Sequence, residues 1–323
     1  MKLSFAPLEG IADYTFRNAH KRIFGGADDY YTPFIAANPS CSLKEKEKRE
    51  VAPELNPGIS LVPQILANRA YAFVSTAQRL AALGYREVNL NLGCPSPAVT
   101  AHGRGAGLLR DQDRLDRFLW ELFEELARAG REGAVPAVSV KTRSGFADRS
   151  ETEGLVRILN RYPFSLVIVH PRLRTQLYAG SADWESFALF YGNCEKKPAY
   201  NGDIRSPEDA GRLMARFPGT EQIMIGRGAV ANPALFRMLK GGRPPGTEEM
   251  SAFHDELLSA RMAEIPLFEK AAGKMKELWF YWSGLFEEPE PYIRRIRKAC
   301  TEEDYRAAVE ALFGECTLKG DAG

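Results

Sequence analysis

Cys94 is the residue of this chain best placed to do chemistry. It follows the alternating apolar run 87–92, which predicts a buried strand, and Gly93 and Pro95 end that strand at once. A thiol held in such a loop can donate a proton or attack an electrophile. The alternative is a structural cysteine in the core, which is the commoner role of a free cysteine.

Three further polar side chains interrupt or end apolar runs. Lys141 ends the run 137–142, where an ammonium group could stabilise negative charge on a ring such as a reduced flavin. Gln64 and Asn91 carry amides that can hydrogen bond to the carbonyl and N–H edges of a ring. Because polar side chains are costly to bury without a partner, their positions favour a ligand over simple packing.

Two glycine-containing turns suit a phosphate group. They follow the runs 222–225 and 197–200, and they offer backbone amides and a guanidinium group. The residues concerned are Gly226, Arg227, Asn201, Gly202 and Asp203. A tight turn without a ligand is the alternative. No G-x-G-x-x-G fingerprint follows the first strand, so a Rossmann site is not indicated. One phosphate site, two amides for a ring edge and one cation near the ring together predict flavin mononucleotide (FMN) as the ligand.

Eight apolar runs predict the strands that position these groups. Most are separated by segments of helical periodicity, at about 30 residues per strand–helix unit, as in a (β/α)₈ TIM barrel. The runs are 3–8, 29–34, 59–66, 87–92, 137–142, 166–170, 197–200 and 222–225. A doubly wound open sheet is the alternative. The barrel would gather the polar residues at its C-terminal face, where such barrels carry their active sites.

The strand pattern stops at a glycine- and proline-rich segment, 241–246, and the rest of the chain has a helical pattern. We therefore predict an α/β protein with two domains. Residues 1–243 form an FMN-binding TIM barrel and residues 244–323 form a small C-terminal helical domain.

The composition is that of an ordinary globular protein, with 45% hydrophobic and 26% charged residues. The net charge of +1 argues neither for nor against a nucleic-acid partner. No apolar run approaches the length of a membrane helix. The 5 cysteines are scattered and form no Cys-x-x-Cys pair, so we predict no metal site, reduced thiols and a cytoplasmic location.

Several motifs, in order along the chain, resemble those of the tRNA-dihydrouridine synthases. They are Ala6-Pro7-Leu8-Glu9-Gly10, Gly93-Cys94-Pro95-Ser96-Pro97, Lys141-Thr142-Arg143, His170-Pro171-Arg172, Asn201-Gly202-Asp203-Ile204 and Gly226-Arg227-Gly228. The resemblance covers the whole predicted barrel. It continues more weakly into the tail, at 274–276 and Tyr281.

The resemblance implies an FMN enzyme, re-reduced by NADPH, that converts a specific uridine of tRNA to 5,6-dihydrouridine. Hydride would pass from flavin N5 to C6 of the base, and Cys94 would protonate C5 as a general acid. The implied cofactor residues are Pro7, Leu8, Glu9, Gln64, Asn91, Lys141, His170, Asn201, Gly202, Asp203, Gly226 and Arg227. For His170 a hydrogen-bonded core histidine is the alternative. We expect a monomer.

The target base must leave its stack to reach a barrel floor, so the enzyme must also hold the RNA backbone. The candidates for tRNA contact are Arg143, Arg172, Arg174, Arg294 and Arg295, and the helical domain 244–323 is expected to be the tRNA-binding domain beside the catalytic barrel 1–243. For the two tail residues a solvated helix face is the alternative.

Two other functions stay open from the sequence. One is an FMN TIM-barrel oxidoreductase acting on a small pyrimidine or dihydroorotate-like substrate, which would have no need of the helical tail. The other is a non-catalytic RNA-binding or scaffold protein, which would not bind flavin.

Overall fold

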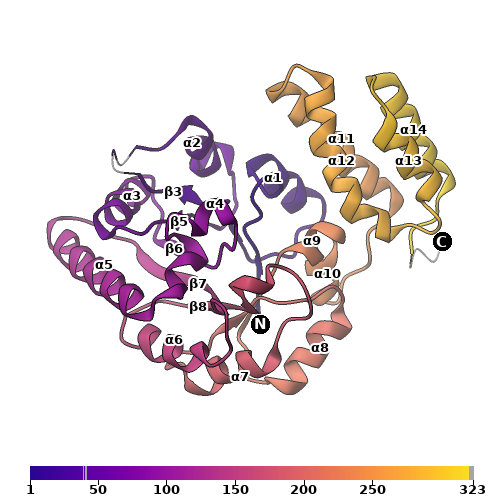
Figure 1. The fold of residues 1–323 in the computed structure, drawn as a ribbon. Helices are drawn as coiled ribbons and strands as arrows, with labels where there is room; N and C mark the ends of the chain where they lie inside the picture. Colours follow the sequence, from indigo (N-terminus) through magenta and orange to yellow (C-terminus); the bar gives the residue numbers. More distant parts are fainter. Residues whose placement is uncertain (39, 41, 320–323) are drawn as a thin grey trace. The chain divides into compact units, whose positions relative to one another are not determined.

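The computed structural model describes residues 1–38, 40 and 42–319. Within them the chain forms two compact units, which we call the barrel unit and the helical unit (Figure 1). The barrel unit comprises Met1–Glu9, Asp28–Asp203 and Gly211–Ile225. The helical unit comprises Gly10–Ala27, Ile204–Ala210 and the described part of Gly226–Gly323. The predicted division into residues 1–243 and 244–323 concerns catalytic and RNA-binding domains and stays a prediction.

The barrel unit contains one sheet of ten strands, all parallel to their neighbours. In chain order the strands are β1 (Lys2–Phe5), β2 (Asp29–Tyr31), β3 (Ile35–Ala36), β4 (Leu61–Val62), β5 (Gln64–Leu66), β6 (Glu87–Leu92), β7 (Ala137–Gly145), β8 (Val167–Leu173), β9 (Ala199–Tyr200) and β10 (Gln222–Ile225). All eight predicted strand runs are confirmed, because β2 with β3 and β4 with β5 each fall within one run.

Two of the strand runs are each divided by a proline, and the pairing between these two runs closes the sheet. Pro33 lies between β2 and β3, and Pro63 lies between β4 and β5, where neither can donate an N–H to the ladder. Thr32 bridges the breaks, because its N–H donates to the carbonyl of Val62 (3.2 Å) and its Oγ1 accepts the N–H of Gln64 (3.0 Å). The strand order runs from β3 to β4, and the pairs β2–β4 and β3–β5 join these two ends. The sheet is therefore a closed eight-stranded barrel, as predicted.

Helices alternate with the strands along the chain. In the barrel unit they are α2 (Glu45–Val51), η1 (Pro53–Leu55), α3 (Ala70–Ala82), α4 (Pro97–Thr100), η2 (Gly105–Arg110), α5 (Gln112–Glu132), α6 (Glu151–Leu159), η3 (Arg174–Gln176), α7 (Trp184–Asn193) and most of α8 (Pro207–Arg216). Helices α3, α5 and α6 lie outside strands β5 to β8 (Figure 1).

Helix starts follow from local capping residues. At α8 the predicted cap is confirmed, because Ser206 Oγ accepts the N–H of Asp209 (3.3 Å) and the Asp209 carboxylate accepts the N–H of Ser206 (3.1 Å). At α5 the Asp111 carboxylate accepts the N–H of Arg114 (3.0 Å). Each such cap contributes about 1 kcal/mol to helix stability.

The inside of the barrel is packed with side chains, as in other barrels of this architecture. One buried cluster draws on six of the eight strand runs: Ala6, Tyr31, Val62, Ile168, Ala199 and Met224. Burying each large apolar side chain contributes about 1.5–3 kcal/mol, so this cluster stabilises the barrel.

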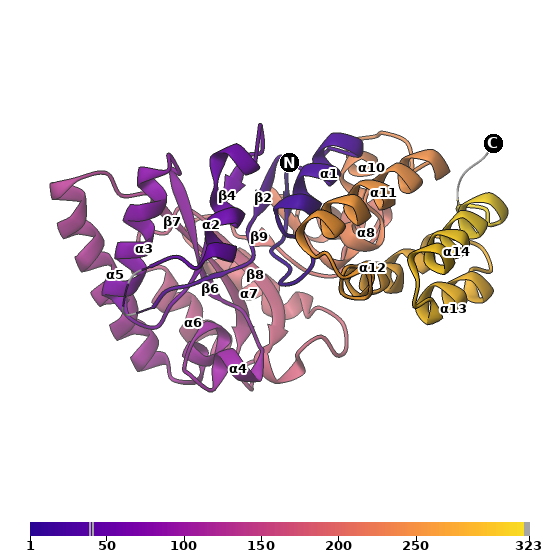
Figure 2. The same cartoon turned by 90° about the horizontal axis from the view of Figure 1, so that it is seen from above.

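The helical unit contains the remaining helices. They are α1 (Tyr14–Ile23), α9 (Arg227–Ala231), α10 (Leu235–Leu239), α11 (Thr247–Glu264), α12 (Phe268–Trp282), η4 (Ser283–Leu285), α13 (Glu290–Lys298) and α14 (Glu302–Glu315). Helices α13 and α14 lie side by side in both views (Figures 1 and 2). The helical pattern predicted for the tail is confirmed.

Helix α1 comes early in the chain but packs on α11. The rings of Phe16 and Phe253 meet edge to face with centroids 5.3 Å apart. Asp13 caps α1 by accepting the N–H of Phe16 (3.1 Å), and its carboxylate also pairs with Arg261. A residue pair 248 positions apart in sequence therefore fixes this helix.

No helix among the described residues has the length and apolarity needed to cross a membrane. Cys94, Cys194, Cys300 and Cys316 are free thiols, and Cys41 lies outside the described residues. Within the described chain, no three His, Cys, Asp or Glu side chains are placed to hold a metal ion.

Candidate active site at the C-terminal side of the barrel

The predicted catalytic and ring-binding residues come together on neighbouring strands. In the parallel ladder Asn91 of β6 is in register with Lys141 of β7, and Gln64 of β5 is in register with Asn89 of β6. Residues in register on adjacent strands point to the same face of a sheet. Cys94 follows β6 by two residues, so its loop stands next to these side chains.

A chain of amide hydrogen bonds holds this loop. Asn91 donates from Nδ2 to Gln64 Oε1 (2.6 Å), and Gln64 donates from Nε2 to Asn89 Oδ1 (2.8 Å). Asn89 in turn donates to Ser139 Oγ (2.9 Å). Asn91 Oδ1 accepts the backbone N–H of Cys94 (2.9 Å), so the strand side chain sets the position of the thiol. Asn89 was not among the predicted site residues.

The backbone around Cys94 is equally constrained. Gly105 has a positive φ of 54°, and a Cβ there would lie 2.9 Å from the carbonyl oxygen of Cys94. That same carbonyl accepts the N–H of Ala106 (3.0 Å). Any larger residue at position 105 would therefore displace the loop that carries the thiol.

Burial and nearby cations act on Cys94 in opposite directions. Burial has the larger effect and raises the pKa of the thiol above its ordinary value, while Lys141 and Arg143 lower it in part. The net shift is upward, so the sulfur keeps its proton at neutral pH. The arrangement suits a proton donor better than a nucleophile.

Lys141 is half-buried next to another cation, which disfavours the protonated form of its amine. Burial, together with the neighbouring Arg143 cation, lowers the pKa of Lys141 to about 7, against a smaller raising effect of Cys94. Among the described residues no acceptor lies within hydrogen-bonding distance of its Nζ. An acceptor on a bound molecule would supply what the protein does not.

Arg143 links the cysteine loop to the loop after β8. It is 1% exposed, and it donates to the carbonyls of Gly93 (3.0 Å) and Leu173 (2.8 Å). Its guanidinium also lies over the ring of Tyr178, 5.5 Å from the centroid. Burial lowers the pKa of Arg143 to about 10, so the group stays charged at neutral pH. Its predicted contact with tRNA stays a prediction.

Arg172 has protein acceptors for all its donors. Its guanidinium bonds to the carboxylate of Asp203 (2.5 and 3.1 Å), to the carbonyls of Ala179 (3.4 Å) and Gly180 (2.7 Å), and to His170 Nε2 (3.0 Å). These contacts use its five N–H groups, which leaves none for an RNA phosphate in this arrangement. In this structure Arg172 joins the loops after β8 and β9, and its predicted contact with tRNA stays a prediction.

The same contact fixes the tautomer of His170. Because a guanidinium can only donate, His170 Nε2 must accept and the ring proton must sit on Nδ1. The predicted role of His170 at a cofactor phosphate stays a prediction.

The strands carrying these groups are longer than predicted. Strand β7 extends to Gly145 and β8 to Leu173, with an irregularity in the ladder between Arg143 and Gly145. Lys141 and His170 therefore lie within strands and not at their ends. The ladder continues because its pairing tolerates this irregularity, which the sequence pattern does not reveal.

The turn after β9 has the close backbone approach that was predicted. A Cβ at Gly202 would lie 2.1 Å from Tyr200 Oη, so only glycine fits. Asn201 donates from Nδ2 to the carbonyl of Met224 (2.8 Å), which ties β9 to β10. Gly226 and Arg227 follow β10 directly and begin α9. Their predicted role at a phosphate stays a prediction.

Other predicted contacts lie at the surface. Pro7 and Leu8 are half-buried after β1, and exposed Glu9 pairs with Lys46 (2.9 Å). Arg294 and Arg295 lie on an exposed face of α13. Arg174 donates to Thr100 Oγ1 (3.0 Å). Their predicted binding roles stay predictions.

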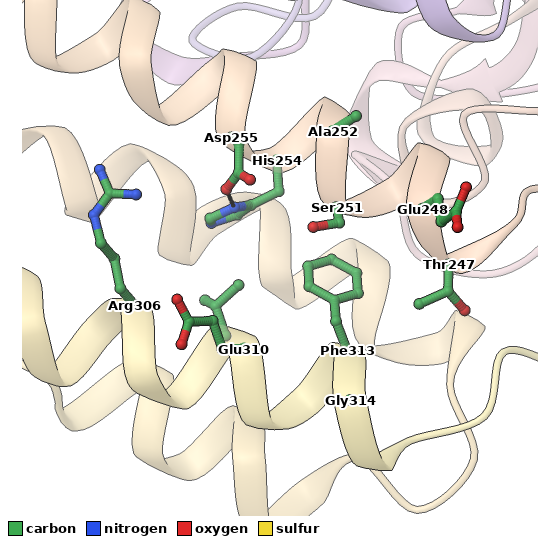
Figure 3. A pocket seen from close by; sticks show the side chains of 11 residues that line it. Thr247, Glu248, Ser251, Ala252, His254, Asp255, Arg306, Glu310, Phe313 and Gly314 are labelled. Carbon is green, nitrogen blue, oxygen red and sulfur yellow. Dashed lines mark hydrogen bonds and ion pairs between the residues drawn. The ribbon is translucent and has the colours of Figure 1, made fainter.

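The helical unit has a pocket of its own, of about 600 Å³, between α11 and α14 (Figure 3). Three carboxylates line it, those of Glu248, Asp255 and Glu310, against the one guanidinium of Arg306. The His254 ring also lines the pocket and bonds through Nδ1 to Asp255 (2.8 Å), as the dashed line in Figure 3 marks. Carboxylates repel phosphate, so this pocket is unsuited to RNA backbone.

Several known proteins are similar to this chain. A tRNA-dihydrouridine(16) synthase of Cupriavidus necator is 30% identical over 334 residues, which cover 98% of each chain. A protein of the same name from Shigella flexneri is 28% identical over 327 residues, covering 97% of this chain and 98% of its own.

Solved structures that share the fold are more distant. Histamine dehydrogenase from Rhizobium sp. 4-9 has a TM-score of 0.57 at 12% identity, covering 86% of this chain and 49% of that chain. The old yellow enzyme from Trypanosoma cruzi has a TM-score of 0.53 at 10% identity, covering 77% and 91%. At these identities the likeness concerns the fold alone.

Residues 4–304 match the family described as dihydrouridine synthase (Dus). That span contains every strand of the barrel except the first two residues of β1, together with the cysteine loop and α1 to α13. The resemblance noted in the sequence is thereby confirmed. This chain belongs to the dihydrouridine synthase family.

Proposed function

We propose that this protein reduces a uridine of tRNA to 5,6-dihydrouridine, with FMN as its cofactor and NADPH as the reductant. The observation that carries the proposal is the pairing of a protonated, half-buried thiol, Cys94, with the lysine Lys141 at the C-terminal side of a closed barrel. The names of the two relatives support uridine 16 as the target.

The donors at the site fit a flavin. Lys141 has no protein acceptor among the described residues, and the amides of Gln64 and Asn91 each keep one N–H beyond the bonds given above. Such a group of unused donors suits the oxygen and nitrogen acceptors along a flavin edge. When bound, FMN would supply the hydride that is added to C6 of the uracil ring.

The chain's own contribution to the reaction is the proton. Cys94 would give its S–H proton to C5 of the base, and the raised thiol pKa keeps that proton available at neutral pH. Lys141 would hold the electron-rich edge of the ring by its positive charge, and His170 would lie at the cofactor phosphate. Because the base must reach Cys94, it must first leave its stack in the RNA.

Substitution of the thiol tests the proposal. Cys94→Ala should purify yellow, with the flavin content of the wild type, and should reduce tRNA at least about 100-fold more slowly, because a positioned general acid contributes about that much. Cys194→Ala is the matched control, since Cys194 is another half-buried free thiol, and it should keep full activity. Dihydrouridine in an unmodified tRNA transcript is measured by reverse-transcription stops. A Cys94→Ala protein with wild-type turnover, or a colourless wild-type protein, contradicts the proposal.

Two further measurements distinguish the alternatives. A small-molecule oxidoreductase would reduce free uracil or orotate-like compounds and leave tRNA unchanged. Mapping dihydrouridine in tRNA from cells that lack the protein should show the loss of one position, expected at 16.

A further inference from the structure

Two arginines share one aromatic ring beside the cysteine loop. The guanidinium carbon of Arg110 lies 4.7 Å from the centroid of Phe146, and that of Arg174 lies 5.6 Å from it. The two cations are therefore within about 10 Å of each other. We call Arg110, Arg174 and Phe146 the arginine rim.

The rim is built on the segments that surround Cys94. Arg110 ends η2, and at the start of η2 the N–H of Ala106 bonds to the carbonyl of Cys94 (3.0 Å). Arg174 donates to Thr100, which ends the short helix directly after the cysteine loop (3.0 Å). All these residues belong to the barrel unit.

The Phe146 ring is fixed by its own loop. Its N–H donates to a carboxylate oxygen of Glu151 (2.5 Å), and its carbonyl accepts the N–H of Thr175 (3.0 Å). The first bond ties the loop after β7 to α6 and the second ties it to the loop after β8, so the backbone that carries the ring is held between the segments of both cations.

The positive charge of the rim is not neutralised within the protein. In the described chain no carboxylate lies within ion-pair distance of Arg110 or Arg174. The carboxylate of Glu151, which contacts the backbone of Phe146, already accepts the N–H groups of residues 146 to 148. Elsewhere in the same unit surface arginines do find acids, as Arg149 does with Asp183 and Arg161 with Asp116. Two like charges held on one ring without a counter-ion favour an anionic ligand.

A second observation, at Arg174, also indicates that the rim lacks a hydrogen-bond acceptor. Its Nε is buried and has no hydrogen-bond acceptor among the described residues. Buried donors without acceptors are rare in folded proteins, and a phosphate oxygen drawn to the rim would allow the side chain to rearrange and satisfy it.

We propose that the arginine rim binds the backbone phosphates of the tRNA next to the nucleotide that is reduced. The inference rests on the proposed function, because a base that reaches Cys94 must carry its neighbouring phosphates past the loops that hold Arg110 and Arg174. The phosphates of NADPH offer the same chemistry. We favour the RNA because Arg110, the last residue of η2, is exposed, so a polymer can continue across it beyond the site.

Single substitutions test the rim. With the flavin-loaded protein, an unmodified tRNA transcript and NADPH, Arg110→Gln and Arg174→Gln should each raise the KM for tRNA about tenfold and leave kcat and flavin content unchanged. Each should also reduce the slope of log Kd for tRNA against log[KCl] by about 0.7 to 0.9, the value for one lost phosphate contact. Arg174→Lys keeps the charge and should restore the slope, which a merely structural role would not predict.

Arg117→Gln is the matched control, because Arg117 is an exposed arginine on α5. It should match the wild type in every measurement. If the Gln variants keep the wild-type KM and salt slope for tRNA, the inference is wrong. If they instead raise the KM for NADPH in flavin reduction without tRNA, the rim binds the nucleotide and not the RNA. A wild-type protein that leaves tRNA unreduced would overturn the proposed function itself.

Discussion

At the residue scale, the environment of Lys141 disfavours the positive charge that its proposed role requires. Its pKa of about 7 means that near neutral pH the folded protein holds it partly uncharged, although an exposed lysine would be fully protonated. Natural proteins accept such unfavourable groups where they serve a ligand. A hydrogen-bond acceptor near Nζ would stabilise the protonated form and offset the free energy of burying it.

Flavin binding should therefore depend on pH through Lys141. Because the protonated fraction falls as pH rises through 7, the affinity of the flavin-free protein for FMN should fall about tenfold between pH 6 and pH 8. Quenching of flavin fluorescence measures this affinity. Riboflavin, which has no titrating phosphate, should give the same trend, and Lys141→Gln should bind weakly with no such trend. An affinity that rises over this range would contradict the role given to Lys141.

Some site residues were readable from the sequence and others were not. Cys94, Lys141, Gln64 and Asn91 were predicted because each is polar at or near the end of an apolar run. Asn89 has the same signal, since alternate residues of a strand share a face, but its role appears only once its bonds to Gln64 and Ser139 are seen.

The sequence is less informative about which arginines are available to bind a ligand. Arg172 was predicted to contact RNA, yet it is 1% exposed and fully used by protein acceptors. Arg110 was not predicted, and it is exposed without an acidic partner in the described chain. Which arginines are free depends on contacts between loops that are distant in sequence, and local pattern does not record them.

At the scale of elements, the turn after β9 is the most tightly specified. A methyl group at position 202 would overlap the Tyr200 ring, so Gly202→Ala should destabilise the protein by about 1–3 kcal/mol and lower its Tm by several degrees. Gly211→Ala is the control, because nothing lies within 4 Å of a Cβ built there in the middle of α8. Alanine is the better helix former, so that change should be neutral or stabilising by up to about 1 kcal/mol. Thermal unfolding followed by circular dichroism compares the two, and equal Tm values would contradict the expected clash.

The strand pattern was predicted from period and composition, but its details depend on pairing. Pro33 and Pro63 lie within the runs 29–34 and 59–66, each of which the sequence pattern predicts as one strand. The structure divides each run, because a proline cannot donate to a neighbour on the side where the ladder needs an N–H. That Thr32 spans the break could not be inferred, since it requires knowing that its neighbours are Val62 and Gln64.

At the scale of the molecule, the sequence placed α1 in the barrel domain because it follows the first strand. In the structure α1 is in one compact unit with α11, through Phe16 on Phe253 and Asp13 with Arg261. Contacts between residues almost 250 positions apart leave no local signature, so this assignment could not be made from the pattern alone.

The helical unit should be sensitive to acid through His20. This residue is fully buried among Phe16, Phe24 and Phe236, and burial lowers its pKa to about 4, despite the bond from its ring to the Pro233 carbonyl (2.9 Å). The unfolded chain takes up a proton at His20 below about pH 6.5 and the folded chain does so only near pH 4. Stability is therefore complete above pH 6.5 and falls as pH drops towards 4, by at most about 3 kcal/mol.

His20→Phe removes the titrating ring and keeps an aromatic side chain. The variant loses the bond to Pro233 and should be less stable than the wild type at pH 7. Its Tm should fall less steeply between pH 7 and pH 4.5, because the difference between the two proteins isolates this one group. Parallel Tm curves would contradict the assignment.

Closure of the barrel through Thr32 has a consequence for how copies of this protein can meet. An open sheet ends in strands whose unpaired N–H and C=O groups can template the addition of a foreign strand, the first step towards fibrils. Here each of the eight strand runs pairs on both sides. Among the described residues the sheet of the barrel unit therefore has no open edge strand on which a foreign strand could be added.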